Sequence, residues 1–241
     1  MKVIKLSVVV FSLMMFVSCT TVCILLEYIT GINIGCPYDP PGNSHPQGIS
    51  QEGKIFVNSL IIANINFAKA CQSTLIAANK AKDAERLGYL ISDMQNNRAK
   101  YTEAKKFKEA LNKINNATKK MKSIDYSKDL NYSIARKEVG KALLFLGIAT
   151  YFDTQAVKMG KEIAPKLTSA LKKDPFNLRK WTNYLTFTQI VIANVPNQLL
   201  MIKDISKNLI QYANSNGCKV PSQNEINKEI EKQRPDVGSG V

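Results

Sequence analysis

The sequence predicts an all-α protein, an antiparallel bundle of about four long amphipathic helices. Beyond residue 49, long segments carry apolar or small residues at alternating spacings of three and four, the stripe that a helix buries against a partner. The chain of 241 residues has only 12 Gly and one Trp, a composition that favours helix over sheet. No alternating run indicates a strand, and short joints between helices favour antiparallel neighbours.

The first predicted helix covers residues 50–95. Its stripe is formed by Leu60, Ala63, Phe67, Ala70, Thr74, Ala77, Ala81, Ala84, Gly88 and Ile91, nine of which are apolar or small. A helix of this length would extend for about 69 Å at 1.5 Å per residue. The pattern gives no sign of an interruption, so we expect one continuous helix.

Three further helices are predicted, over residues 96–123, 128–173 and 178–215. The 128–173 helix carries a second stripe, made of Val139, Ala142, Leu146, Ala149, Asp153, Ala156, Gly160, Ile163, Leu167 and Ala170. Pro165 and Pro196 should kink the helices that contain them, because proline removes a backbone hydrogen bond. Gly217 is a fitting end for the last long helix. Residues 218–241 are predicted to be a polar tail with one short helix.

The N-terminal residues resemble an export signal. Lys2 and Lys5 precede an uncharged stretch, residues 6–17, which is followed by Ser18 and Cys19. A basic start, a short apolar core and a small residue before the cut are typical of secretory signal peptides. The residues Val-Ser-Cys at 17–19 resemble the end of a bacterial lipobox, although Phe16 stands where that family usually has Leu. The resemblance covers the first 19 residues and implies a lipoprotein whose lipid-carrying N-terminus is Cys19.

Two alternatives remain open for this segment. Residues 6–26 carry no charge, and about 20 apolar residues can span a bilayer, so a single uncleaved transmembrane anchor is one. An ordinary secreted protein is the other. All three readings place the folded part outside the cytoplasm. The lipoprotein and the anchored protein would stay in the cell envelope, facing the periplasm or the cell surface. The predicted organisation is a signal (1–18), a membrane-proximal segment with a Pro-rich linker (19–48), a helical bundle (49–217) and the tail (218–241).

The five cysteines are expected to serve anchoring and covalent bridging. If Cys19 carries lipid, four remain in a compartment that permits disulfides. In a four-helix bundle the first helix starts and the last helix ends at the same end, which predicts a bridge between Cys36 and Cys218, with Cys23 as competitor. The cysteine spacing matches no zinc motif and the chain has one histidine, so no metal site and no cofactor are expected.

Positive charge is concentrated in the second predicted helix. The formal net charge is +14, and residues 98–122 hold nine basic residues against two acidic ones. Such a face suits anionic lipid, an envelope polymer or another envelope protein, while a simple solvated helix face is the alternative. Nucleic acid is not expected, because export removes the chain from it. The candidate binding residues are Lys105, Lys106, Lys108, Lys113, Lys119 and Lys120.

Asp153 is the one acid in the apolar stripe of the third predicted helix. A buried carboxylate is costly unless it is hydrogen-bonded or paired. Asp153 therefore contacts a ligand, is satisfied by a Lys, Tyr or Thr of a neighbouring helix, or lies on a stripe rotated enough to expose it. No nucleotide, metalloprotease or nucleophile motif is present, and no enzyme is expected. The predicted function is binding or scaffolding by a membrane-tethered bundle. The alternatives are a carrier of an apolar or anionic ligand and, third, an enzyme that uses Asp153.

We predict that Cys19→Ala leaves the chain uncleaved or releases it from the membrane, because acylation requires the thiol. Intact-mass analysis of membrane-extracted protein reports cleavage and acylation together. A variant with the same processed mass and the same membrane partitioning as the parent would contradict lipidation at Cys19.

Overall fold

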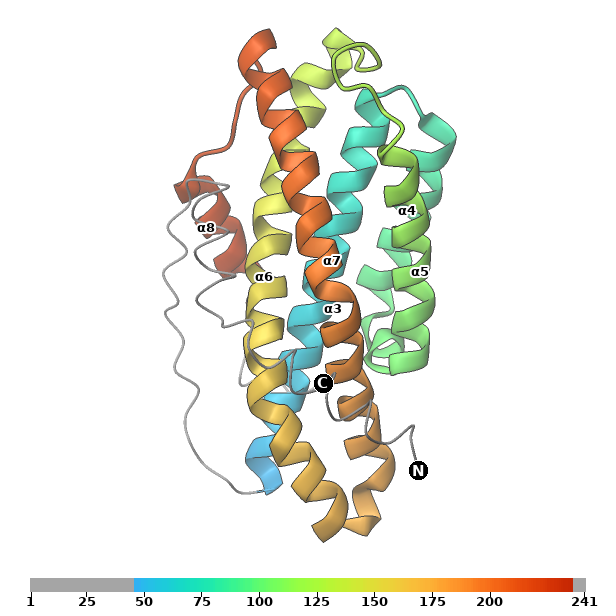
Figure 1. Cartoon of the computed structure of the whole chain (residues 1–241), viewed down its shortest axis with the longest axis vertical. Coiled ribbons are helices and arrows are strands. Elements are labelled where there is room, and N and C mark those ends of the chain that lie inside the picture. Colours follow the sequence, from blue (N-terminus) through green and yellow to red (C-terminus); the bar gives the residue numbers. More distant parts are fainter. Residues whose placement is uncertain (1–45, 236–241) are drawn as a thin grey trace, which may run out of the picture. The chain divides into compact units, whose positions relative to one another are not determined.

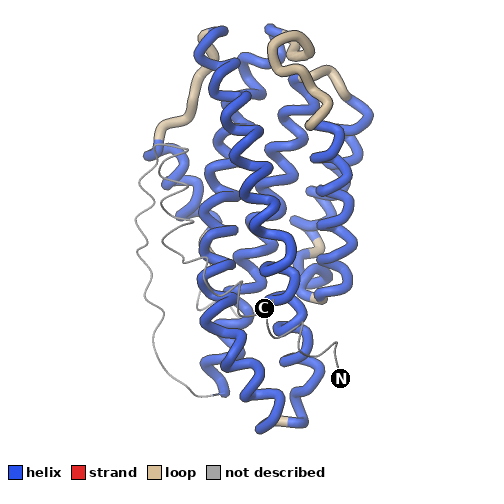
Figure 2. The backbone as a smooth tube through the Cα atoms, in the orientation of Figure 1, coloured by secondary structure: helices blue, strands red, loops and turns tan. Residues whose placement is uncertain are grey.

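The computed structural model describes residues 46–235, and this part is all-α, as predicted (Figure 2). No strand occurs among these residues. Two short 3-10 helices, η1 (Arg98–Thr102) and η2 (Pro175–Asn177), join longer elements. The α-helices are α3 (Pro46–Ala77), α4 (Ala81–Asn96), α5 (Ala104–Met121), α6 (Tyr132–Lys173), α7 (Leu178–Asn216) and α8 (Gln223–Gln233).

The predicted continuous helix over 50–95 is wrong, because the chain reverses direction after Ala77. Asn79 adopts a left-handed backbone conformation with φ of 55°, a region that Asn tolerates better than most residues. The amide of Lys80 then donates to the carbonyl of Leu75 at 2.8 Å, which closes the turn. The apolar pattern continues across this turn because α4 buries its own stripe, including Ala84 and Ile91.

This reversal gives the described helices an up-and-down order in which α3, α5 and α7 run one way and α4, α6 and α8 the other (Figure 1). Gln72 Nε2 in α3 donates to the carbonyl of Ala84 in α4 at 3.2 Å, which fixes the first antiparallel pair. The amide of Asn131, just before α6, donates to the carbonyl of Ala77 at 2.8 Å. Helix α6 therefore starts beside the end of α3.

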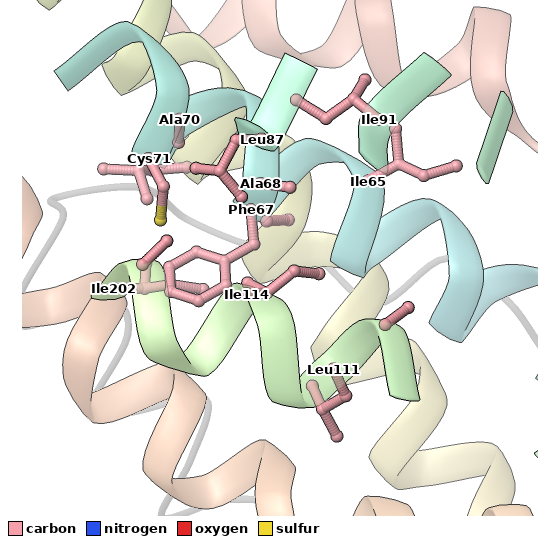
Figure 3. Packing of buried hydrophobic residues seen from close by; sticks show 14 of the residues in the cluster. Ile65, Phe67, Ala68, Ala70, Cys71, Leu87, Ile91, Leu111, Ile114 and Ile202 are labelled. Atoms are coloured by element: carbon pink, nitrogen blue, oxygen red, sulfur yellow. The ribbon is translucent and has the colours of Figure 1, made fainter. Parts of the chain in front are cut away.

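The most extensive helix contact lies between α3 and α6. Their predicted stripes are buried against the rest of the bundle, and Leu60, Ala63 and Phe67 have at most 1% exposure. Small residues let the two backbones approach: a Cβ added at Gly160 of α6 would lie 3.3 Å from the ring of Phe56. On another side of α3, Phe67 points toward Ile114 of α5 (Figure 3).

The two prolines lie inside continuous helices, Pro165 in α6 and Pro196 in α7. Helix α7 ends at Gly217, whose φ of 62° is left-handed, as predicted for a glycine helix end.

The predicted short helix of the tail is α8, which begins with a capping box between Ser222 and Glu225. It packs on α6, where Ile226 occupies the space beside Gly147.

Two described helices are long and apolar enough to cross a membrane by length and composition alone, residues Ile49–Ala77 and Leu178–Asn216. In the first helix, 83% of the most apolar 18-residue segment is buried inside the bundle, as in the core helix of a packed domain. In the second helix, 39% of the corresponding segment is buried. Both helices are compatible with membrane association, and neither requires it.

Candidate functional site

Helix α5 presents the candidate basic face. Its apolar side is buried, with Phe107 and Ile114 fully inside the bundle. The opposite side holds the six candidate lysines, which we call the α5 basic face; Lys106 is half-buried and the other five are exposed. The face is a consequence of amphipathic spacing, because burying one side of the helix forces the lysines onto the other.

Only two of these lysines pair with an acid in the described residues. Lys106 Nζ lies 3.4 Å from Glu109, and Lys120 Nζ lies 2.5 Å from Asp83 of α4. The bond from Lys120 holds the pKa of the Asp83 carboxyl below its usual value. The other four have no acid within 4.0 Å in the described part of the chain, and these are Lys105, Lys108, Lys113 and Lys119. The face therefore carries an excess of uncompensated positive charge.

Asp153 lies in the bundle interior with 0% exposure. Gln198 Nε2 of α7 donates to Oδ2 of Asp153 at 2.9 Å, and Oδ1 of Asp153 has no hydrogen-bond partner within residues 46–235. Burial raises the pKa of the Asp153 carboxyl well above its ordinary value, and the Gln198 bond opposes this only in part. The acid is thus held in its neutral form more readily than an exposed aspartate. Sequence reasoning placed Asp153 in the stripe but missed Gln198, whose only signal is a polar residue at helical spacing among apolar ones.

Little else converges on Asp153 that would support catalysis. Gln198 is the one described residue whose side chain donates a hydrogen bond to Asp153. Within residues 46–235 no group of three or more His, Cys, Asp or Glu side chains could hold a metal ion. The described part of the site is a buried amide–acid pair, without a second titratable group placed to exchange a proton.

The described cysteines are Cys71 and Cys218, which are buried and form no disulfide with another described residue. Burial raises the pKa of Cys71 to about 12, and its Sγ lies 3.9 Å from Thr118 Oγ1. A thiol with so high a pKa is a poor nucleophile at neutral pH. Cys71 is therefore a packing residue of the α3–α5 contact.

The lipidation candidate Cys19 and the bridge candidate Cys36 lie outside the described residues. The geometry expected for the Cys36–Cys218 bridge is nevertheless corrected. Glu52, near the start of α3, pairs with Lys166 of α6 at 2.9 Å, whereas the carbonyl of Lys219 lies against Gly140 near the other end of α6. The start of α3 and the end of α7 therefore lie at opposite ends of the bundle. The bridge itself stays a prediction without that support.

We predict that stability depends on pH through Asp153. Because the folded state raises its pKa, the folded protein holds this proton more tightly than the unfolded chain. The resulting stabilisation is complete below the unfolded pKa of about 4 and is lost as pH rises through the folded pKa, by at most about 1.4 kcal/mol per unit. Asp153→Asn does not titrate, so its free energy of unfolding should exceed the parent's increasingly above pH 4.

Denaturant unfolding across pH measures this difference, with Asp204→Asn, an exposed acid of α7, as the control that should track the parent. Asp153→Leu should likewise be neutral or stabilising near pH 7, because an apolar side chain avoids desolvation. Parallel pH curves for Asp153→Asn and the parent would contradict the buried neutral acid. A stable Asp153→Leu variant that loses a cellular phenotype would assign the acid a function beyond structure.

Comparisons with known proteins were made at the level of families, curated sequences and solved structures. No family model, no curated protein and no solved structure matches this chain. The geometry of the chain itself, above all the α5 basic face and the buried Asp153–Gln198 pair, is therefore what supports a function.

Proposed function

We propose that this protein is an exported, membrane-tethered helical bundle with a binding or scaffolding role in the cell envelope, and that the α5 basic face is its docking surface. The observation that carries the proposal is the set of four exposed lysines on one helix that have no acid partner in the described residues. A lysine and an acid three or four residues apart on a helix can form a stabilising pair, and among the six lysines of the α5 basic face only Lys106 does so.

The partner class follows from this charge. A surface rich in lysine attracts polyanions, and each basic residue near a charged membrane contributes roughly 1 kcal/mol. In a cell envelope the polyanions are anionic lipid headgroups and anionic polymers. The buried side of α5 anchors the lysines on the folded bundle, so binding would not need α5 to rearrange. Screening by salt should weaken the attraction, since exposed charges are involved.

We predict that the α5 basic face supplies most of the affinity for anionic surfaces. Replacing Lys105, Lys108 and Lys119 with Gln should weaken binding to anionic vesicles by roughly a hundredfold, because about 1 kcal/mol is lost per charge. The binding should also become less sensitive to salt. The measurement holds the full chain in zwitterionic nanodiscs and adds phosphatidylglycerol vesicles at several salt concentrations.

The matched control replaces three exposed lysines on other helices that likewise lack an acid partner in the described residues, Lys137, Lys207 and Lys228. It removes the same charge and should bind almost as the parent does. If the two triple variants lose affinity equally, net charge alone drives binding and α5 is no docking surface. If neither loses affinity, the lysines only solvate the helix.

A further inference from the structure

The turn between α6 and α7 exposes apolar side chains at one end of the bundle. Residues 172–180, which we call the α6–α7 tip, include Phe176 and Leu178. Phe176 is 97% exposed and Leu178 is 52% exposed, and Phe176 is the most exposed large apolar side chain in the described residues. Scattered exposed apolar residues are ordinary on a protein surface, but two on one short turn form an apolar patch, and such patches mark interaction sites.

The same turn is rich in positive charge. Lys172, Lys173 and Arg179 are exposed, and none has an acid within 4.0 Å in the described part of the chain. The only acid of the tip is Asp174, whose Oδ2 accepts hydrogen bonds from Asn177 Nδ2 at 2.9 Å and Trp181 Nε1 at 3.4 Å.

These two bonds hold the turn in shape, with Trp181 buried below it. Lys180 Nζ lies 5.0 Å from the centroid of the Trp181 ring, which adds a cation–π contact at the base of the tip. Phe176 is therefore presented by an ordered turn. An aromatic residue and a leucine flanked by lysine and arginine are the composition of segments that lie in a membrane interface, where the apolar groups enter and the cations meet the headgroups.

The tip lies at the end of the bundle where the described chain begins. Glu52 of α3 pairs with Lys166 of α6, and a Cβ at Gly53 would meet the ring of Tyr184 near the start of α7. The start of α3 and the α6–α7 turn therefore share one end (Figure 1). The residues ahead of α3 include Cys19, the proposed lipid tether, and the uncharged stretch 6–26, the alternative transmembrane anchor. A membrane tether ahead of α3 would thus be attached to the bundle at the end that carries the tip.

We propose that the α6–α7 tip inserts into the membrane interface, with Phe176 and Leu178 among the lipid chains and headgroups and with Lys172, Lys173 and Arg179 on anionic headgroups. Its orientation rests on the proposed membrane tether. The tip would be a second contact with the membrane, besides the tether, and two contacts would set the bundle upright.

If the bundle stands upright on the membrane, the far end of the α5 basic face is too distant from that membrane to bind it, which restricts the kinds of partner this face can have. The amide of Ala104, at the start of α5, donates to Asn183 Oδ1 of α7 at 2.9 Å. Asn183 lies seven residues beyond Phe176, or about 10 Å at 1.5 Å per residue. The 18 residues of α5 add about 25 Å, so the far end of α5 lies about 35 Å from the tip. The screening length is about 8 Å at physiological ionic strength. Lys119 and Lys120 would thus face a second anionic surface or polymer and not the bilayer that holds the tip.

The test places a fluorescent reporter at the tip of the full chain. Phe176→Trp, reconstituted in vesicles of phosphatidylcholine and phosphatidylglycerol, should show added emission shifted to shorter wavelength, and lipids brominated in the acyl chain should quench most of it. Tyr89→Trp on α4, which is 69% exposed, is the control and should emit as in water without quenching. The buried Trp181 is common to both variants and reports that the bundle is folded.

Replacing Lys172, Lys173 and Arg179 with Gln in the Phe176→Trp background should reduce the quenching on anionic vesicles. If the chain stays on the vesicles but Phe176→Trp emits as Tyr89→Trp does, the tip inference is overturned and the tether stands. If the chain washes off the vesicles, tether and tip both fail. A blue shift that follows protein concentration in detergent without vesicles would show self-association through Phe176 and would also overturn membrane insertion.

Discussion

The burial of α3 is the constraint on which the rest of the structure depends. Nearly every residue from Phe56 to Ala68 is buried, and no charge occurs between Lys54 and Lys69. A helix that is apolar on all sides must be surrounded, and α3 contacts α4, α5, α6 and α7. Its buried asparagines donate to their own helix, Asn64 to Leu60 and Asn66 to Ile62, each at 2.9 Å. Burial of this length of helix explains why the outer helices form a layer around it.

Because the middle of α3 takes up the apolar interior, charged side chains lie mainly on the outer helices. Lys69, at the border, keeps its Nζ 5.4 Å from the ring of Phe145, and burial lowers the pKa of this lysine. The remaining lysines project from the outer faces of the bundle, most densely from α5. Two acids of α6 are buried all the same: Glu138, which pairs with Lys141, and Asp153, which is held inside by one amide. At pH values above the pKa of Asp153 in the unfolded chain, this buried acid lowers the stability of the fold. An apolar residue at the same position would avoid that cost.

Much of the helical content could be predicted from residue spacing, but the topology could not. The stripe from Val139 to Ala170 lies within one helix, α6. The stripe from Leu60 to Ile91 continues through the turn at Asn79, because α4 packs its own apolar residues back against α3. Periodicity reports which residues are buried and not whether the helix that carries them turns round. One missed reversal put the start of α3 and the end of α7 at the same end, and the expected approach of Cys36 to Cys218 depended on it.

The candidate sites were predictable to different degrees for the same reason. The lysines of α5 follow from local amphipathic spacing, which the sequence contains in full. The contact of Gln198 with Asp153 joins residues 45 positions apart on two helices, and no local pattern encodes it. Phe176 stands between two basic pairs in the sequence, yet its exposure depends on the bonds of Asp174 to Asn177 and Trp181. That the tip shares an end with the start of α3 follows only from the reversal at Asn79.

The distance between the start of α3 and the end of α7 tests this topology most directly. Spin labels at Lys54 and Ser215, both exposed, can be attached through an unnatural amino acid in the full chain, and pulsed electron resonance reports their separation. Lys54 is level with about residue 164 of α6 and Ser215 with about residue 136, by the contacts of Glu52 with Lys166 and of Gln198 with Asp153. The six-helix order predicts a separation of about 40 Å at 1.5 Å per residue. A separation below about 20 Å, expected for one continuous first helix in a four-helix bundle whose neighbouring axes lie 8–10 Å apart, would contradict the reversal at Asn79.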